Sequence, residues 1–368
     1  MIPQMATLDP TFCRLRQERL RDLMAAQGVE AFLTTHRHHI HWATGHWHSQ
    51  PLTSVALLVF REGPTILVLP DEPDSPPLAD RVLSYSAQKV CTLIEDMDAA
   101  SAAVLAPHLV SFQEAIGVAG AVAPPFLAAL SHPPLNVTTA FQRLRRLKDP
   151  DEIRALRRCI AATDAVYEEA RRLLVPGLTE IALFAALQAA ATIAAGEPLS
   201  GWGNDFQCGS PGGPPRHRPA KSSEIAVLDI GVGIQGYRSD LCRSFVVGSA
   251  PSQAQQEAHS RVVSVLQEVE DRLRPGVSCR DLFNFAKSRL DGWEGGAFFH
   301  HLGHGIGLDA HEVPRLNPQW NDTLASGDVI AVEPGIYRED LRAGLRLEQN
   351  YLITPDGAER LSHYPLDL

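Results

Sequence analysis

Four acidic residues lie in or beside apolar runs of this chain, where a lone charge is costly. Asp229 follows the apolar run of EIAVLDIG, and Asp240 lies eleven residues later in YRSDLCRSFVV. Glu333 follows VIAV, and in LRLEQN the alternation of a strand places Glu348 on the same face as Arg346. A carboxylate buried in such surroundings needs a cation, a hydrogen-bond network or a metal ion.

Two explanations compete for these acids. A single one would ordinarily cap a helix or pair with an arginine. Four together favour a metal centre, because carboxylates that share a site repel one another unless cations neutralise them. Carboxylates combined with one histidine are the ligand set of Mn, Fe, Co or Zn in two-metal centres. The candidate histidine is His304 in HHLGHGIGLDAHEVP, where the neighbouring glycines allow close backbone approach and His311 follows seven residues later.

Five segments carry a more specific likeness: LDIG, SDLCRSF, GHGIGLDAHEVP, VEPGIY and GLRLE. Together they resemble the signature of the pita-bread metallopeptidases, family M24, which includes Xaa-Pro aminopeptidase, prolidase, methionine aminopeptidase and creatinase. The resemblance implies two divalent metal ions, with Mn²⁺ expected first and Co²⁺, Fe²⁺ or Zn²⁺ as alternatives. The implied metal ligands are Asp229, Asp240, His304, Glu333 and Glu348.

The same resemblance implies a role for each of these residues. Asp240 and Glu348 would bridge the two metals, Asp229 would hold one of them, and the other would be held by His304 and Glu333. Glu333 would also move a proton during the reaction. His311 would donate a hydrogen bond to the developing oxyanion, rather than being a histidine satisfied in the core.

Three further residues are expected to contact substrate. His300 matches a substrate-contacting histidine of the prolidase branch, and His217 is matched to the family's upstream histidine, although its region is compressed. Arg346 would either bind a substrate carboxylate or pair with a ligand acid. The sequence also departs from the family pattern: His301 replaces a glycine, Cys242 a threonine and Gln349 an acid.

The stretch from Thr35 to His48, THRHHIHWATGHWH, holds six of the fifteen histidines. The resemblance places it in a strand and loop of the N-terminal domain, away from the metals. We therefore expect His39 and His41 to be polar strand residues, since strand side chains alternate between faces. The alternative is that these histidines, with Trp42 or Trp47, line a substrate pocket where the N-terminal domain of a dimer reaches over an active-site mouth.

The elements that must position these residues suggest two domains. An amphipathic helix is expected over Phe12–Gln27, and the short apolar runs VEAFLTT, SVALLVF and PTILVLP are typical of buried strands, so the first domain is α/β. A long helix should begin with Asp149 as its cap and Glu152 three residues later. We predict a creatinase-like N-terminal domain at 1–146 and an α+β pita-bread catalytic domain at 147–368.

Composition excludes several classes of partner. The net charge of -10 argues against nucleic acid and anionic membranes, which both require a basic face. The six cysteines form no CxxC pair, which favours a reducing compartment without a thiolate zinc site or disulfides. The chain has no apolar run of about 18 residues and no apolar leader, so we expect a cytoplasmic protein. The family resemblance also implies a homodimer.

The expected activity is hydrolysis by a dinuclear metal centre. An Xaa-Pro aminopeptidase or a prolidase-like Xaa-Pro dipeptidase would act on a small peptide with proline in second position. The alternative is an ectoine-hydrolase-like enzyme that opens a cyclic amidine or cleaves another small non-peptide amide. A creatinase reaction is disfavoured, because that branch works without this metal set. A non-catalytic binding module is disfavoured because all five ligand positions are filled.

Overall fold

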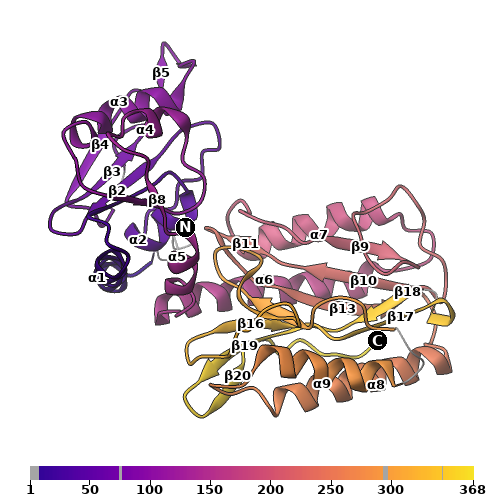
Figure 1. Ribbon diagram of the computed structural model, residues 1–368. Helices are drawn as coiled ribbons and strands as arrows, with labels where there is room; N and C mark the ends of the chain where they lie inside the picture. Colours follow the sequence, from indigo (N-terminus) through magenta and orange to yellow (C-terminus); the bar gives the residue numbers. More distant parts are fainter. Residues whose placement is uncertain (1–7, 74–76, 293–296, 342) are drawn as a thin grey trace. The chain divides into compact units, whose positions relative to one another are not determined.

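A computed structural model describes residues 8–73, 77–292, 297–341 and 343–368. The chain divides into two compact units, Met1–Arg145 (unit 1) and Arg146–Leu368 (unit 2), whose elements are labelled in Figure 1. Among the described helices, none combines the length and the apolar composition needed to cross a membrane.

Unit 1 folds around a mixed sheet whose central strands are buried. Its strands, in spatial order, are β4 (Arg81–Ser84), β3 (Thr65–Leu69), β2 (Ala56–Phe60), β1 (Ala31–Thr34), β7 (Ile116–Val118) and β8 (Leu135–Asn136). β1 pairs antiparallel with β2 and parallel with β7. Because both faces are covered, these strands read in the sequence as continuous apolar runs. The predicted α/β character is confirmed.

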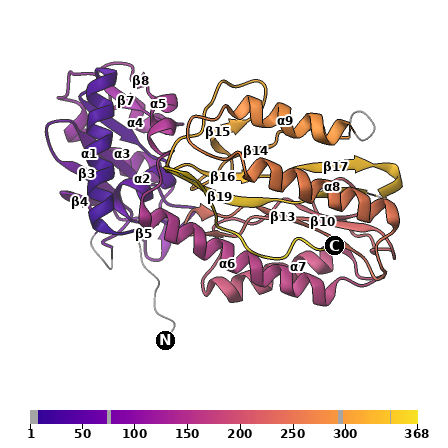
Figure 2. The same ribbon diagram turned by 90° about the horizontal axis from the view of Figure 1, so that it is seen from below.

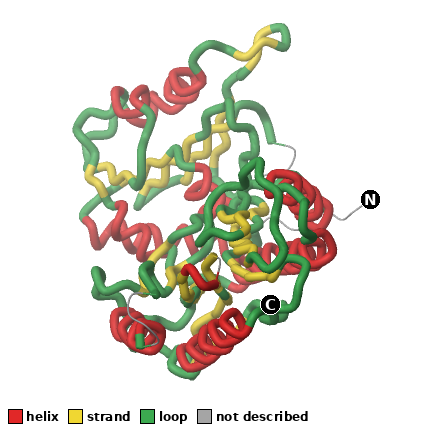
Figure 3. The backbone as a smooth tube through the Cα atoms, turned by 90° about the vertical axis from the view of Figure 1, so that its right-hand side faces the viewer, coloured by secondary structure: helices red, strands yellow, loops and turns green. Residues whose placement is uncertain are grey.

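Helices cover the two faces of this sheet (Figure 1). On one side lie α3 (Met97–Leu109) and α4 (Pro124–Ala128), and on the other α1 (Pro10–Gln27), α2 (Arg37–Thr44) and α5 (Thr138–Leu144). The predicted first helix is confirmed: α1 starts at an Asp9 cap and ends at Gly28, whose φ of 67° suits glycine. A short hairpin, β5 (Gln88–Lys89) with β6 (Thr92–Leu93), projects at the top of Figures 1 and 3.

The histidine-rich stretch is not a strand, so that prediction is wrong. Its centre forms helix α2, which ends at Gly45, and the run from His39 to Thr44 is entirely buried. The His39 imidazole hydrogen-bonds Thr34 and packs on Phe141. Burial lowers the pKa of His41 to about 3, so this histidine is neutral. Alternation carried no information here, because a helix buried on all sides has no polar face.

Unit 2 begins with the long helix α6 (Pro150–Leu173). The Asp149 side chain accepts from the helix backbone, and Glu152 reaches back to the Asp149 amide at 3.0 Å. This capping box, with Pro150 in the first turn, satisfies amides that no helical carbonyl can reach. The predicted start of the helix is confirmed, and the helix ends shortly before Pro176.

The strands of unit 2 lie between two pairs of helices (Figures 1 and 2). Helices α6 and α7 (Glu180–Ala195) cover one side, and α8 (Gln253–Glu270) with α9 (Cys279–Asp291) covers the other. One antiparallel sheet has the order β13 (Leu241–Val246), β10 (Ile225–Ile230), β9 (Asp205–Cys208). A second has the order β15 (Glu312–Leu316), β14 (Gly303–Gly305), β16 (Val329–Val332), β19 (Gln349–Thr354), β20 (Gly357–Arg360).

Two smaller antiparallel pairs complete the described strands of unit 2. They are β11 (Gly233–Ile234) with β12 (Tyr237–Arg238), and β17 (Gly335–Arg338) with β18 (Ala343–Arg346). A single 3-10 turn, Glu339–Leu341, follows β17. Antiparallel sheets with helices on both sides confirm the α+β pita-bread class predicted for the C-terminal domain.

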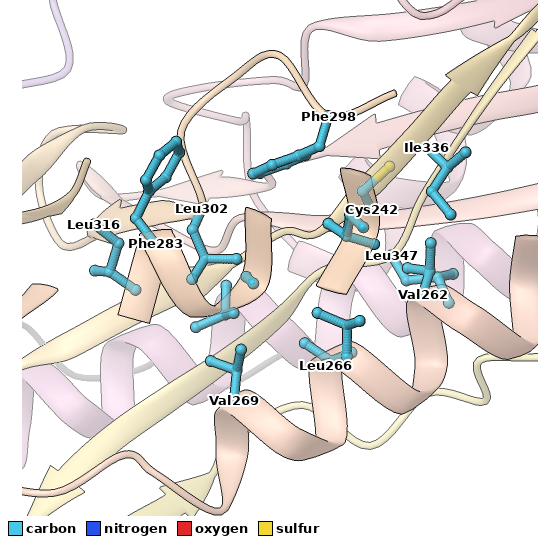
Figure 4. Close-up of a cluster of buried hydrophobic side chains, with 14 of the residues drawn as sticks. Cys242, Val262, Leu266, Val269, Phe283, Phe298, Leu302, Leu316, Ile336 and Leu347 are labelled. Carbon is cyan, nitrogen blue, oxygen red and sulfur yellow. The ribbon is translucent and has the colours of Figure 1, made fainter. Parts of the chain in front are cut away.

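The core beneath the strands is formed by the inner face of α8. Figure 4 shows Val262, Leu266 and Val269 pointing from α8 toward side chains that include Leu347 and Cys242. All of these side chains are almost fully buried. This apolar floor supports β13, which Asp240 directly precedes, and the segment after β18, which carries Glu348.

On the opposite side, Tyr167 of α6 anchors the same strands. Its hydroxyl lies 2.5 Å from the carbonyl oxygen of Leu241 and 3.3 Å from that of Leu228. These carbonyls belong to residues directly beside Asp240 and Asp229. The helix therefore fixes the backbone that presents two of the acidic side chains.

We predict that Tyr167→Phe lowers the free energy of unfolding by about 1 kcal/mol, because it leaves a buried carbonyl without its donor. Urea unfolding measures this change. The control is Tyr364→Phe, which removes a hydroxyl bonded to the partly exposed Arg171 and should cost less. Equal losses in the two variants would contradict the anchoring role.

Candidate metal centre

The four acids reach one cavity from different strands of unit 2. Asp229 lies near the end of β10, and Asp240 directly precedes β13. Glu333 directly follows β16, and Glu348 lies between β18 and β19. All four line a cavity of about 400 Å³ together with His304. The structure thus brings together all five residues predicted as metal ligands.

His304 is held with one ring nitrogen free for the cavity. Its Nδ1 donates to the carbonyl of Gly305 at 3.1 Å, which leaves the lone pair on Nε2. That atom lies 3.5 Å from Glu333 Oε1 and 3.8 Å from Asp240 Oδ2. Glycine is required beside it, because a Cβ on Gly303 would collide with the carbonyl of a neighbouring strand.

The carboxylates of this cavity repel one another electrostatically. Burial, together with neighbouring charges, raises the pKa of Asp229 to about 6 and raises the pKa values of Asp240 and Glu348 well above their ordinary range. Burial would also raise the pKa of Glu333, but a hydrogen bond from His301 and the nearby imidazoles hold it at about 2. The raised pKa values mean that protons neutralise part of the negative charge of these carboxylates where no metal cation is bound.

Two oxygens of the cavity support occupation by metal ions. Asp229 Oδ1 and Glu348 Oε2 are buried, and neither has a hydrogen-bond partner among the described residues. Buried polar atoms are rarely left unsatisfied. Oxygens from four carboxylates and one imidazole nitrogen suit borderline and hard divalent cations. The residues present therefore fit a centre of two divalent metal ions.

Arg346 is the main cation of the cavity wall. Its Nη2 donates to Asp229 Oδ2 at 2.9 Å and also contacts Asp205 of β9, and its Nη1 donates to the hydroxyl of Tyr337 at 3.0 Å. Asp205 faces Asp229 directly across the β9–β10 ladder. Of the two roles considered for Arg346, the structure shows the pairing with a ligand acid.

His300 and His311 line the same cavity. His300 Nδ1 donates to the carbonyl of His301 at 2.7 Å, so its Nε2 accepts from the Tyr337 hydroxyl at 2.8 Å. The His311 ring stacks on His304 with a centroid distance of 3.7 Å. His311 is exposed to the cavity and is thereby available to a substrate.

His217 lies elsewhere. Its side chain is exposed, and it is not among the described residues that line the cavity. The cavity wall is formed instead by Pro211 and Gly212 of the same compressed segment. The match that the sequence suggested for His217 therefore has no geometric support.

Two buried polar side chains hold the backbone of the ligand residues. The guanidinium of Arg243 donates to the carbonyls of Cys242 and Glu348 at 2.8 and 2.7 Å. Asn350 bonds both the amide and the carbonyl of Asp240. Backbone bonds of this kind fix the direction of a carboxylate that could otherwise turn away from its neighbours.

Comparison with known proteins decides the family. Residues 154–355, more than half of the chain, match the family model for Metallopeptidase family M24. The chain belongs to this family. Residues 16–128 match the Creatinase/Prolidase N-terminal domain. Both matches confirm the resemblance and the two-part fold that the sequence predicted.

Individual relatives of this M24 member carry peptidase names. An uncharacterized peptidase of Staphylococcus aureus is 30% identical over 241 residues, which are 62% of this chain and 66% of that protein, just under two thirds. A Pyrococcus horikoshii Xaa-Pro dipeptidase is 34% identical over 158 residues, 43% of this chain and 44% of that protein. The structure of an Xaa-Pro dipeptidase from Bacillus anthracis has a TM-score of 0.82 at 20% identity, covering 97% of this chain and 99% of that one. At 20% identity, the likeness to the Bacillus anthracis structure shows a shared fold alone.

Sequence reasoning missed two residues of this M24 site. Tyr337 is the last residue of the motif VEPGIY, so its position shortly after the expected ligand Glu333 could have identified it as a site residue. Asp205 follows no motif, and only the long-range pairing of β9 with β10 brings it to Arg346. His301 was noticed as a departure, and the structure gives it a 2.7 Å hydrogen bond to Glu333 Oε1.

We predict that Arg346→Gln destabilises the metal-free protein by roughly 3–5 kcal/mol, because the partly buried carboxylates of Asp205 and Asp229 lose their buried cation. The deficit should shrink as the pH is lowered, since protonation removes the uncompensated charge. Urea unfolding in excess chelator measures both effects. The matched control is Arg338→Gln, whose pair with Asp340 is partly exposed and should contribute less than about 1 kcal/mol. Similar losses in both variants would refute the role given to Arg346.

Proposed function

We propose that this chain is a dinuclear metal-dependent hydrolase of the Xaa-Pro class, with its catalytic domain at 147–368. The observation that carries the proposal is the meeting of all five expected ligand residues in one cavity. The Pyrococcus horikoshii relative named Xaa-Pro dipeptidase supports the substrate class. No observation favours the small non-peptide amide, so we propose only the peptide. The enzyme would be cytoplasmic, as its scattered cysteines favour, and a homodimer, as the family resemblance implies.

The ligand residues divide between two cation positions. Asp240 and Glu348 would contribute to both, Asp229 to one, and His304 with Glu333 to the other. Divalent cations bound there supply Lewis acidity and activate water at neutral pH. The predominance of carboxylate oxygens favours Mn²⁺, with Co²⁺, Fe²⁺ and Zn²⁺ as alternatives.

Two side chains would act on the peptide itself. The carboxylate of Glu333 lines the cavity beside the expected ligands, where it could accept a proton from water and pass it to the leaving amine. His311 lies beside His304 on the open side of the cavity. Its ring N–H is suited to donate to an oxygen that gains negative charge in the transition state.

The cavity also bears on substrate length. Among its described lining residues, Arg346 is the one arginine and there is no lysine. That guanidinium already binds Asp205 and Asp229, so it is poorly placed to bind the carboxylate at the end of a dipeptide. Phe299, 68% exposed, and His300 offer apolar ring surface for proline. These features favour an aminopeptidase acting on Xaa-Pro peptides longer than two residues.

The first test of this function is metal dependence. Chelation should abolish hydrolysis of Xaa-Pro peptides, and Mn²⁺ or Co²⁺ should restore it best. His304→Ala should lower the metal content, measured by mass spectrometry, below about two ions per chain. His38→Ala, in the histidine-rich stretch of unit 1, is the control and should keep it. Full activity in a metal-free preparation would refute the proposal.

The second test concerns His311. His311→Ala should retain its metal ions and lose about 10² to 10³ in kcat, since it removes one oxyanion donor. KM should change little, because the interaction forms only in the transition state. Glu333→Ala is the comparison and should lose both turnover and metal affinity. Weak metal binding by His311→Ala, or nearly normal turnover, would show that this role is wrong.

A further inference from the structure

His301 is a cavity residue that the proposed mechanism does not use. Its side chain is 31% exposed, and its Nε2 lies 2.7 Å from Glu333 Oε1. The Nε2 of His304 lies 3.5 Å from the same oxygen. Glu333 Oε1 is therefore flanked by nitrogens of two different imidazoles, one on β14 and one on the segment leading into it.

This spacing is that of neighbouring ligands on one cation. Ligand atoms about 2.0 to 2.2 Å from a metal and at near right angles to each other lie roughly 3 Å apart. His301, His304 and His311 each offer a ring nitrogen, and these nitrogens lie within 4.8 Å of one another. Three imidazoles around one carboxylate form a denser nitrogen cluster than the five predicted ligands provide.

Ring orientation separates the two candidates for an added ligand. His304 and His311 are stacked at an interplanar angle of 15° with centroids 3.7 Å apart, so their in-plane lone pairs lie in separate, nearly parallel planes and do not converge on one point. The rings of His301 and His304 meet at 85° with centroids 5.3 Å apart. Rings at this angle can direct their lone pairs toward a common point, so His301 is better placed than His311 to join His304.

We propose that His301 is a further protein ligand of the metal centre, binding through Nε2 the cation that His304 and Glu333 hold. The inference rests on the proposed dinuclear site. It makes the two positions more unequal, because the position of Asp229 has oxygen ligands only, whereas the other, which already has the nitrogen of His304, gains a second nitrogen. Nitrogen ligands favour Co²⁺ and Zn²⁺ over Mn²⁺. The centre should therefore bind two different metals when both are offered.

The test is metal binding by the full-length chain after removal of metal with a chelator. Co²⁺ and Mn²⁺ are titrated separately and then in competition, and bound metal is measured by mass spectrometry and Co²⁺ absorption. His301→Ala should lose more than about 100-fold in Co²⁺ affinity at one position, beyond the roughly 10- to 100-fold that loss of an outer-shell partner costs, with a changed absorption spectrum and a lower preference for Co²⁺ over Mn²⁺. The matched control is His300→Ala, a neighbouring imidazole of the same cavity, which should keep the Co²⁺ affinity.

A second variant separates ligation from a simple hydrogen bond. His301→Gln keeps an N–H donor at similar reach to Glu333 and offers no imidazole. Failure of His301→Gln to restore Co²⁺ binding supports ligation, whereas full restoration overturns it. Wild-type Co²⁺ affinity in His301→Ala also overturns it, provided that His304→Ala loses metal. If His304→Ala keeps both ions as well, the dinuclear site itself is refuted.

Discussion

Repulsion among the carboxylates of Asp229, Asp240, Glu333 and Glu348 constrains the rest of unit 2. These four acids and Asp205 line a cavity of about 400 Å³, and burial makes each negative charge expensive. In the metal-free protein, Arg346 neutralises part of this negative charge. The raised pKa values of Asp240 and Glu348 favour protonation, which neutralises a further part. The fold must therefore be stable enough without metal to keep these carboxylates in place, although only bound cations can fully offset their repulsion.

The surrounding structure meets this demand with backbone restraints rather than with flexible side chains. Arg243 and Asn350 bond the main chain beside the acids, and Tyr167 does the same from α6. The inner face of α8 supplies an apolar floor beneath the same strands. Asp229, Asp240 and Glu348 thus each lie at or beside a backbone carbonyl that a buried side chain holds in place. Such rigidity suits electrostatic catalysis, which depends on charges that do not reorganise.

Local signals predicted much of this arrangement. The capping residues of α6 act over a few residues, so the helix start could be read from the sequence. The convergence of the five side chains was implied by the resemblance of their motifs to a known family. Contacts between distant segments that no motif marks could not be predicted. The pairing that brings Asp205 to Arg346 depends on the register of β9 against β10. The burial of His39 depends on packing against Phe141, about a hundred residues away, and the exposure of His217 depends on the path of its loop.

The glycines on either side of His304 limit which nearby positions can be substituted. At Gly303 and Gly305 any side chain would strike the main-chain carbonyl of an adjacent strand, so mutation there is closed to every other amino acid. His301, two residues before β14, carries no such restriction, because part of its side chain is exposed. Substitution near His304 is therefore easier at position 301 than at either glycine. Divergence between related enzymes can alter the chemistry around an unchanged histidine without disturbing the sheet that carries it.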